Sequence, residues 1–120
     1  MSAKYRLAYY ETDSGRQPVA GWIDGRSASE RAKVSWILAR LSESGFLLGP
    51  PWLKKLDDDI WEVRVRHAGS QLRVLFYLRR RDTFVLLHAF SKKTQTTPKR
   101  MLDTARARLM QDWERAKESD

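Results

Sequence analysis

The sequence predicts an α+β domain with one open sheet, in which an N-terminal strand and two helices precede an antiparallel three-stranded meander and a C-terminal helix. Residues 61–66 alternate apolar and polar side chains with the period of a half-buried strand. In 71–78 the same period separates the apolar set Leu72, Val74, Phe76 and Leu78 from Gln71, Arg73, Leu75 and Tyr77. Residues 84–90 are almost wholly apolar, which is typical of a buried strand. Apolar residues at three- and four-residue spacing in 27–44 and 98–117 favour two long amphipathic helices. A chain of 120 residues is expected to form a single domain.

The N-terminal part is expected to supply a short strand and the first two helices. Residues 5–10 alternate loosely and are few, as in an edge strand, and apolar pairs in 18–23 suffice for one or two helical turns. Ser27 and Glu30 have capping-box spacing at the start of the next helix, and Gly45 is expected to end it. The buried stripe of this helix should contain Val34, Ile37, Leu38 and Leu41.

The hairpin in the middle of the chain brings two arginines together. If Ala68 and Gly69 centre the turn, Arg64 faces Arg73 directly, on the side of the ladder opposite its apolar set. Like charges placed opposite each other destabilise a ladder, so phosphate binding explains this pair better than folding does. Glu62 lies one diagonal step from Arg73 and is expected to hold its guanidinium. We expect Arg73 on the exposed face of the central strand of the meander.

A second basic group follows the last predicted strand. Lys92 and Lys93 lead into a polar loop, after which Thr97 is expected to cap a helix whose first residue is Pro98. Two ammonium groups beside a helix N-terminus form a favourable place for a phosphate. The buried stripe of this last helix should contain Leu102, Ala105, Leu109, Trp113 and Ala116.

The charge of the chain suits an acidic partner. The formal net charge is +8, which fits a nucleic acid or an acidic protein and does not choose between them. Cysteine is absent, so neither a disulfide nor a thiolate metal site is expected. No apolar run approaches the roughly 18 residues of a membrane span, and residues 1–6 lack the apolar core of a signal peptide. We expect a cytoplasmic protein with no membrane partner.

These cations permit cleavage of RNA without a metal or cofactor. A cationic cluster binds a phosphodiester and offsets charge in its pentacoordinate transition state, while the ribose 2′-hydroxyl supplies the nucleophile. His88 is either a general base or, within an apolar strand, a hydrogen-bonded core residue.

Other conspicuous residues favour structural roles. Asp57, Asp58 and Asp59 lack the spacing of metal ligands and are interpreted as a solvated turn. Residues 79–82 are interpreted as a charged turn between two strands. Four tryptophans are expected in the core rather than as stacking platforms for bases: Trp36, Trp52, Trp61 and Trp113.

Short motifs then carry a resemblance to a known family. Lys55-Leu56 is followed by WEVR at 61–64, RVLF at 73–76, LHAFSKKTQ at 87–95 and Thr97-Pro98. With these motifs, residues 19–108 resemble bacterial type II toxins of the RelE/ParE superfamily, in the HigB-like branch related to the phage Gp49-like proteins. The sequence departs from the usual pattern of that family at Asp59, Thr96 and Met101, where Gly, Lys and Glu are common.

The resemblance implies a RelE-like fold and a ribosome-dependent endoribonuclease that cleaves mRNA and leaves a 2′,3′-cyclic phosphate. It also implies neutralisation by a cognate helix-turn-helix antitoxin. Arg73 matches the arginine that contacts the scissile phosphate, Arg64 matches a basic position on the preceding strand, and Lys92 and Lys93 match paired lysines. With His88, these four are the candidate catalytic residues. The candidate RNA-binding residues are Lys55, Arg66, Lys99 and Arg100.

Two other functions are compatible with the same residues. One is a ParE-like poison of DNA gyrase, which would act through protein contacts. The other is a nucleic-acid-binding module without catalysis, because no general base stands out. Facing arginines and paired lysines favour the nuclease.

Overall fold

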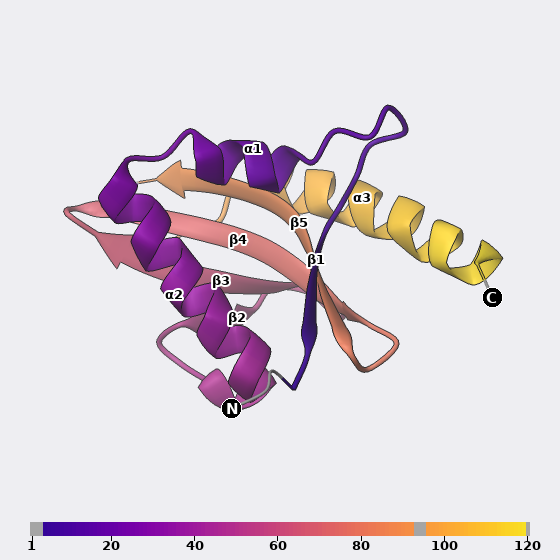
Figure 1. The fold of residues 1–120 in the computed structure, drawn as a ribbon, viewed down its shortest axis with the longest axis horizontal. Coiled ribbons are helices and arrows are strands. Elements are labelled where there is room, and N and C mark those ends of the chain that lie inside the picture. The colour runs from indigo at the N-terminus through magenta and orange to yellow at the C-terminus, as the bar shows by residue number, and fades with distance from the viewer. Residues whose placement is uncertain (1–3, 93–95, 120) are drawn as a thin grey trace.

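The computed structural model describes residues 4–92 and 96–119, which form a five-stranded sheet with helices on both faces (Figure 1). The strand order is β1-β5-β4-β3-β2, and the predicted α+β class is confirmed. The strands are β1 Arg6–Tyr9, β2 Leu53–Lys55, β3 Trp61–His67, β4 Ser70–Arg79 and β5 Thr83–Lys92. The helices are α1 Pro18–Asp24, α2 Ala28–Ser44, the short 3₁₀ helix η1 Gly45–Leu48, and α3 Lys99–Glu118.

The two edge strands differ in how well the sequence predicts them. β1 lies at one edge, as expected, and pairs in parallel with β5. β2 lies at the other edge, antiparallel to β3, and was not expected. Its three residues are too few to show a period of two, so the sequence pattern does not distinguish them from a connector.

Local chemistry sets the bounds of α2. The Glu30 N–H donates to the Ser27 hydroxyl at 3.2 Å and the Ser27 N–H donates to Glu30 Oε1 at 3.1 Å, so the predicted capping box is confirmed. Gly45 ends the helix with φ +59°. A Cβ at this position would stand 2.5 Å from the ring of Tyr5, so only glycine fits. The predicted stripe of Val34, Ile37, Leu38 and Leu41 is buried.

The sheet has a core on each face, and a bulge in β5 decides which side chains enter each. Val74 and Phe76 of β4 pack beneath α1 and α2, whereas Leu75 and Tyr77 pack beneath α3. Leu75 pairs with His88 and Phe76 pairs with Leu86, which leaves one extra residue in β5. The extra residue shifts the alternation of side chains between the two faces by one position from His88 onward. As a result, Phe90 and Lys92 lie on the face of the sheet that α3 covers.

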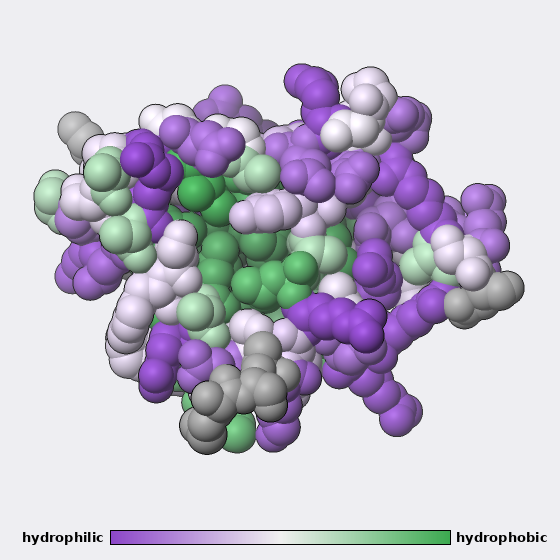
Figure 2. Space-filling model, viewed as in Figure 1, coloured by the Kyte–Doolittle hydropathy of each residue, from purple (hydrophilic) through white to green (hydrophobic). Residues whose placement is uncertain are grey.

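The surface over α1 and α2 is mixed in character. Apolar side chains gather at its centre, between α1, α2 and β1, and polar side chains surround them (Figure 2). α3 extends beyond the sheet, and its far end carries hydrophilic side chains together with some of intermediate hydropathy (Figures 1 and 2).

Three of the four tryptophans expected in the core are substantially exposed. Trp36 is 51% exposed, Trp113 40% and Trp52 38%, so the prediction is wrong for these three, whereas Trp61 packs against the core. Trp36 lies between Val34 and Ile37 in the sequence but is not part of the buried stripe of α2, beside which it lies. At Trp113, α3 turns the neighbouring Asp112 toward the sheet in place of the tryptophan, and Asp112 is buried. The Asp112 carboxylate accepts hydrogen bonds from Tyr77 at 2.5 Å and from Arg79 at 2.9 Å.

Candidate functional site

The hairpin register places the two predicted arginines opposite each other. β3 and β4 pair with Arg64 against Arg73 and Glu62 against Leu75, as the turn at Ala68 and Gly69 predicts. Both turn residues have positive φ, 48° and 84°, as a two-residue hairpin turn requires. Both arginines lie on the face of the sheet that α3 covers.

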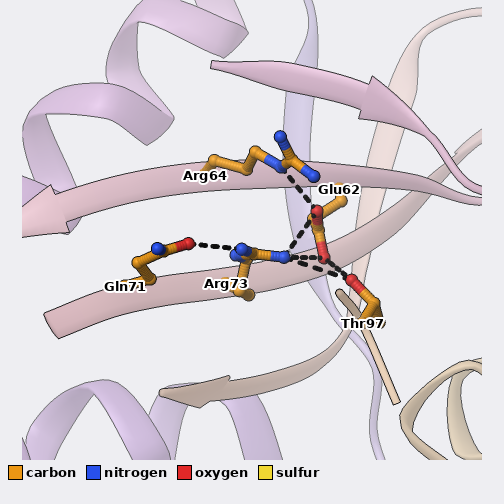
Figure 3. Close-up of polar contacts among 5 residues, drawn as sticks. All are labelled: Glu62, Arg64, Gln71, Arg73 and Thr97. Carbon is orange, nitrogen blue, oxygen red and sulfur yellow. Dashed lines mark hydrogen bonds and ion pairs between the residues drawn. The ribbon is translucent and has the colours of Figure 1, made fainter. Parts of the chain in front are cut away.

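A buried carboxylate joins the two guanidinium groups. Arg73 Nη1 donates to both oxygens of Glu62 at 3.0 Å, and Arg64 Nε donates to Glu62 Oε1 at 2.8 Å (Figure 3). Glu62 is fully buried and lies between the two arginines. The predicted contact of Glu62 with Arg73 is therefore confirmed, and it explains how the ladder tolerates two facing cations.

Arg73 is fully buried, so its predicted position on an exposed face is wrong. Nη1 also donates to the Thr97 hydroxyl at 3.2 Å, and Nη2 donates to the Gln71 side chain (Figure 3). Thr97 in turn donates to Glu62. The segment that leads into α3 thus lies over this part of β4, which the strand pattern alone does not reveal.

This use of Thr97 also corrects the predicted helix start. α3 begins at Lys99 with Pro98 as its N-cap residue, and no side chain caps it. The Thr97 hydroxyl contacts Glu62 and Arg73 instead. Helix capping and the buried network compete for the same hydroxyl group.

Arg64 is the more accessible of the two arginines. Its side chain is 27% exposed, and Lys92 is partly exposed at the end of β5 beside Gln71. Partial burial and the charges of Arg73 and Arg64 lower the pKa of Lys92, while Glu62 opposes that shift. One carboxylate therefore faces three cations, and an incoming anion would reduce the remaining repulsion.

Two grooves meet at Arg64. One, of about 400 Å³, is lined by Lys54, Lys55, Leu56, Arg64, Thr96, Thr97 and Leu102. The other, of about 440 Å³, is lined by Pro51, Trp52, Arg64, Val65, Arg66 and Gln71. Sequence reasoning selected Lys55 and Arg66 but missed Lys54, which pairs with Glu62 across the ladder and so shares the face of Arg64. Recognising β2 would have identified it.

The remaining predicted cations lie around this site. Lys99 and Arg100 are exposed in the first turn of α3, and Lys99 forms an ion pair with Asp103 at 3.1 Å. Lys93 falls outside the described residues. The roles assigned to these three residues stay predictions.

His88 contacts α3. Arg108 Nη1 lies 3.1 Å from its Nδ1, and its Nε2 lies 3.1 Å from the sulfur of Met101. A neutral ring with the proton on Nε2 satisfies both contacts. Burial, reinforced by the Arg108 charge, lowers the pKa of His88 to about 4. These contacts match the interpretation of His88 as a hydrogen-bonded core residue, and its catalytic role stays a prediction.

The three successive aspartates form a turn that is attached to α3. Arg106 forms ion pairs with Asp57 and, at 3.8 Å, with Asp59, so the turn is not merely solvated. The Asp58 backbone N–H and Arg106 both lower the pKa of Asp57. Across residues 4–92 and 96–119, no group of three or more His, Asp or Glu side chains is placed to hold a metal ion. Metal independence stays a prediction.

Together the fold and the site define a small basic α+β domain whose sheet carries a buried carboxylate–guanidinium network beneath cationic grooves. The chain belongs to the Gp49-like family, because the model described as "Phage derived protein Gp49-like" matches residues 21–110. That range contains Arg64, Arg73 and Lys92. A search of curated proteins gave no match. No helix within the described ranges is long and apolar enough to cross a membrane.

Proposed function

We propose that this protein is the toxin of a type II toxin–antitoxin system, in the HigB-like branch of the RelE/ParE superfamily, and that it cleaves mRNA on the ribosome. Membership of the Gp49-like family supports a toxin of phage-derived type. The observation that carries the nuclease proposal is the partly exposed Arg64 guanidinium, held by a buried carboxylate where two basic grooves meet.

The proposed reaction is an internal transfer within RNA. The ribose 2′-hydroxyl loses its proton and its oxygen attacks the neighbouring phosphorus, while the bond to the 5′-oxygen of the next nucleotide breaks and that oxygen takes up a proton. The products are a 2′,3′-cyclic phosphate and a 5′-hydroxyl. Charge grows on the phosphoryl oxygens in the transition state, so the main task of the protein is to orient the substrate and stabilise that charge.

Arg64 and Arg73 have different roles in this proposal. A guanidinium has five N–H donors, and Glu62 engages Arg64 only through Nε, so Arg64 is placed to contact the phosphate. Arg73 is fully buried and bonded to both oxygens of Glu62. We assign Arg73 as a positioning residue that holds Glu62, and through it Arg64. Lys92 adds positive charge from the neighbouring strand.

The partners follow from this activity. The substrate is mRNA in the ribosomal decoding site, which places the protein in the cytoplasm and in contact with ribosomal RNA. A cognate helix-turn-helix antitoxin neutralises it. The net charge of +8 suits an antitoxin segment that is acidic.

Primer extension on ribosome-bound mRNA after induction tests the proposal. Wild-type protein should produce new 5′ ends in phase with codons, and Arg64→Ala should not. Absence of such ends, despite soluble wild-type protein, would contradict the nuclease assignment. Trapped gyrase–DNA complexes in their place would indicate a gyrase poison, and RNA binding without cleavage would indicate a non-catalytic module.

A further inference from the structure

We propose that Trp36 and Trp52 form a second subsite, which stacks an unpaired base of single-stranded RNA next to the phosphate held at Arg64. This inference rests on the proposed function, because it extends the same site toward the neighbouring nucleotide. It starts from two large aromatic side chains that the fold leaves exposed.

Both rings line one small hollow on the outside of the domain. Its volume is about 150 Å³, and it is lined by Lys33, Trp36, Ile37, Trp52, Val65 and Arg66. Trp36 comes from α2 and Trp52 from the segment before β2, so two separate elements supply the aromatic walls. Ile37 and Val65 belong to the core and form an apolar floor. A hollow lined by two aromatic rings suits the planar base of a nucleotide.

Backbone pairing fixes Trp52 beside the phosphate site. The Arg64 N–H donates to the Trp52 carbonyl at 2.7 Å, and the next residue, Leu53, pairs with Val63. Trp52 and Arg66 also line the groove of about 440 Å³ that contains Arg64. The small hollow and the phosphate site therefore adjoin along the β3 edge.

The charge around the two rings matches a nucleic acid. Lys33 and Arg66 lie at the hollow, and the Arg40 guanidinium lies over the Trp36 ring, 5.9 Å from its centroid. Neither this hollow nor the groove beside it is lined by an acidic side chain among the described residues. Sequence-tolerant binding of single strands combines such cations with aromatic platforms.

An acidic protein segment is the other class of partner that this surface suits. Continuity with Arg64 favours RNA, because a strand whose phosphate lies at Arg64 must pass its next nucleotide along one of the two adjoining grooves. The groove on this side leads to Trp52 and then to Trp36.

The test measures binding of short fluorescein-labelled oligoadenylate to the purified full chain, by anisotropy and without ribosomes. Trp36→Ala and Trp52→Ala should each weaken binding by between about 5- and 150-fold, the range for loss of one stacked base. Trp36→Phe and Trp52→Phe, which keep an aromatic ring, should lose much less. Trp113→Ala is the matched control, because Trp113 is similarly exposed on α3 and lines neither hollow. It should bind as wild type does.

A second oligonucleotide separates stacking from charge. An abasic ribose-phosphate strand of the same length should bind wild type and the two alanine variants equally, whereas Arg66→Ala should weaken binding of both strands. Unequal binding of the abasic strand by folded variants would overturn the stacking assignment.

Two further results would overturn the proposal, and both can be distinguished from a result showing that the protein does not cleave mRNA. Alanine variants that bind oligoadenylate as wild type does would show that the rings do not stack bases, whether or not the protein cleaves mRNA. Variants that bind RNA normally but escape neutralisation by the antitoxin would assign the hollow to a protein partner. Weakened binding in a protein that never cleaves mRNA would support the subsite and contradict only the nuclease.

Discussion

Arg73 Nη1 donates to both carboxylate oxygens of Glu62 at 3.0 Å, and both side chains are fully buried. Two buried ions in contact make removal of either costly, because the other is left with less compensation. The Thr97 hydroxyl and Arg64 complete the shell around Glu62. This pair therefore connects the stability of the sheet to the geometry of the candidate site.

Arg73→Ala should destabilise the protein. The free energy of unfolding, measured by urea titration, should fall by about 3–5 kcal/mol, because the Glu62 charge loses its principal buried partner. Adding Glu62→Gln to Arg73→Ala should recover part of this loss, since the uncompensated charge is removed. Arg66→Ala, on the same sheet face but exposed, is the control and should change stability little. An Arg73→Ala protein as stable as wild type would show that the buried pair contributes nothing.

Acidification should weaken the fold through His88. Its pKa is about 4 in the folded protein against an ordinary value of 6.5, so the unfolded chain binds more protons between these values. This contribution is complete above pH 6.5 and is lost as the pH falls toward 4. Allowing for partial exposure of the His88 ring to solvent, stability at pH 5 should be roughly 1 kcal/mol below that at pH 7.5.

Replacing His88 should reduce that dependence. Urea unfolding of His88→Gln at pH 5 and pH 7.5 should show a smaller difference than wild type. His67→Gln, at the other histidine of the chain, is the control and should keep the wild-type difference. Equal pH dependence in wild type and His88→Gln would show that His88 is not the group responsible.

Expression of the protein alone should arrest growth, and co-expression of a helix-turn-helix protein encoded beside it should restore growth. The physical reason is coverage of a strongly basic surface by an acidic partner segment. Growth curves check the first part, and pull-down of the two proteins checks the second. Normal growth with soluble toxin confirmed on a gel would count heavily against the proposal.

Cleavage should not require a transition metal. The described residues contain no group of three or more His, Asp or Glu side chains suited to a metal, and cysteine is absent from the chain. Cleavage by programmed ribosomes should be measured at constant magnesium, which the ribosome itself needs, while zinc or manganese is titrated. A rate that rises and falls with either metal would contradict this expectation.

Short-range patterns predicted much of the fold. A period of two and a two-residue turn determine the register that brings Arg64 opposite Arg73, and a capping box determines the start of α2. β2 escaped prediction because three residues carry no period. Trp36 lies outside the predicted buried stripe of α2, so its exposure agrees with the helical pattern, and its assignment to the core rested on its hydrophobicity alone.

The site was predicted less completely than the fold, because some of its contacts come from residues that are distant in the sequence. Glu62 and Arg73 are neighbours across a ladder, so pattern and register find them. Thr97 lies 24 residues from Arg73 and 35 residues from Glu62 along the chain, and only the path of the segment before α3 reveals that Arg73 is buried. The same reasoning applies to Asp112, a polar residue within the buried stripe of α3, whose partners lie on β4.

The most direct test of the account is the single-turnover rate of mRNA cleavage on programmed ribosomes by Arg64→Ala. Arg64 has a partly exposed side chain, and Glu62 keeps Arg73 and Thr97 as partners without it, so the variant should unfold close to the wild-type urea midpoint. Its rate should fall by about 100- to 1000-fold, the loss expected for one donor to the transition state. Arg81→Gly, which removes an exposed arginine from a turn with φ 71°, should cleave at the wild-type rate. Wild-type cleavage by a folded Arg64→Ala protein would contradict the assignment of Arg64 as the phosphate-binding residue.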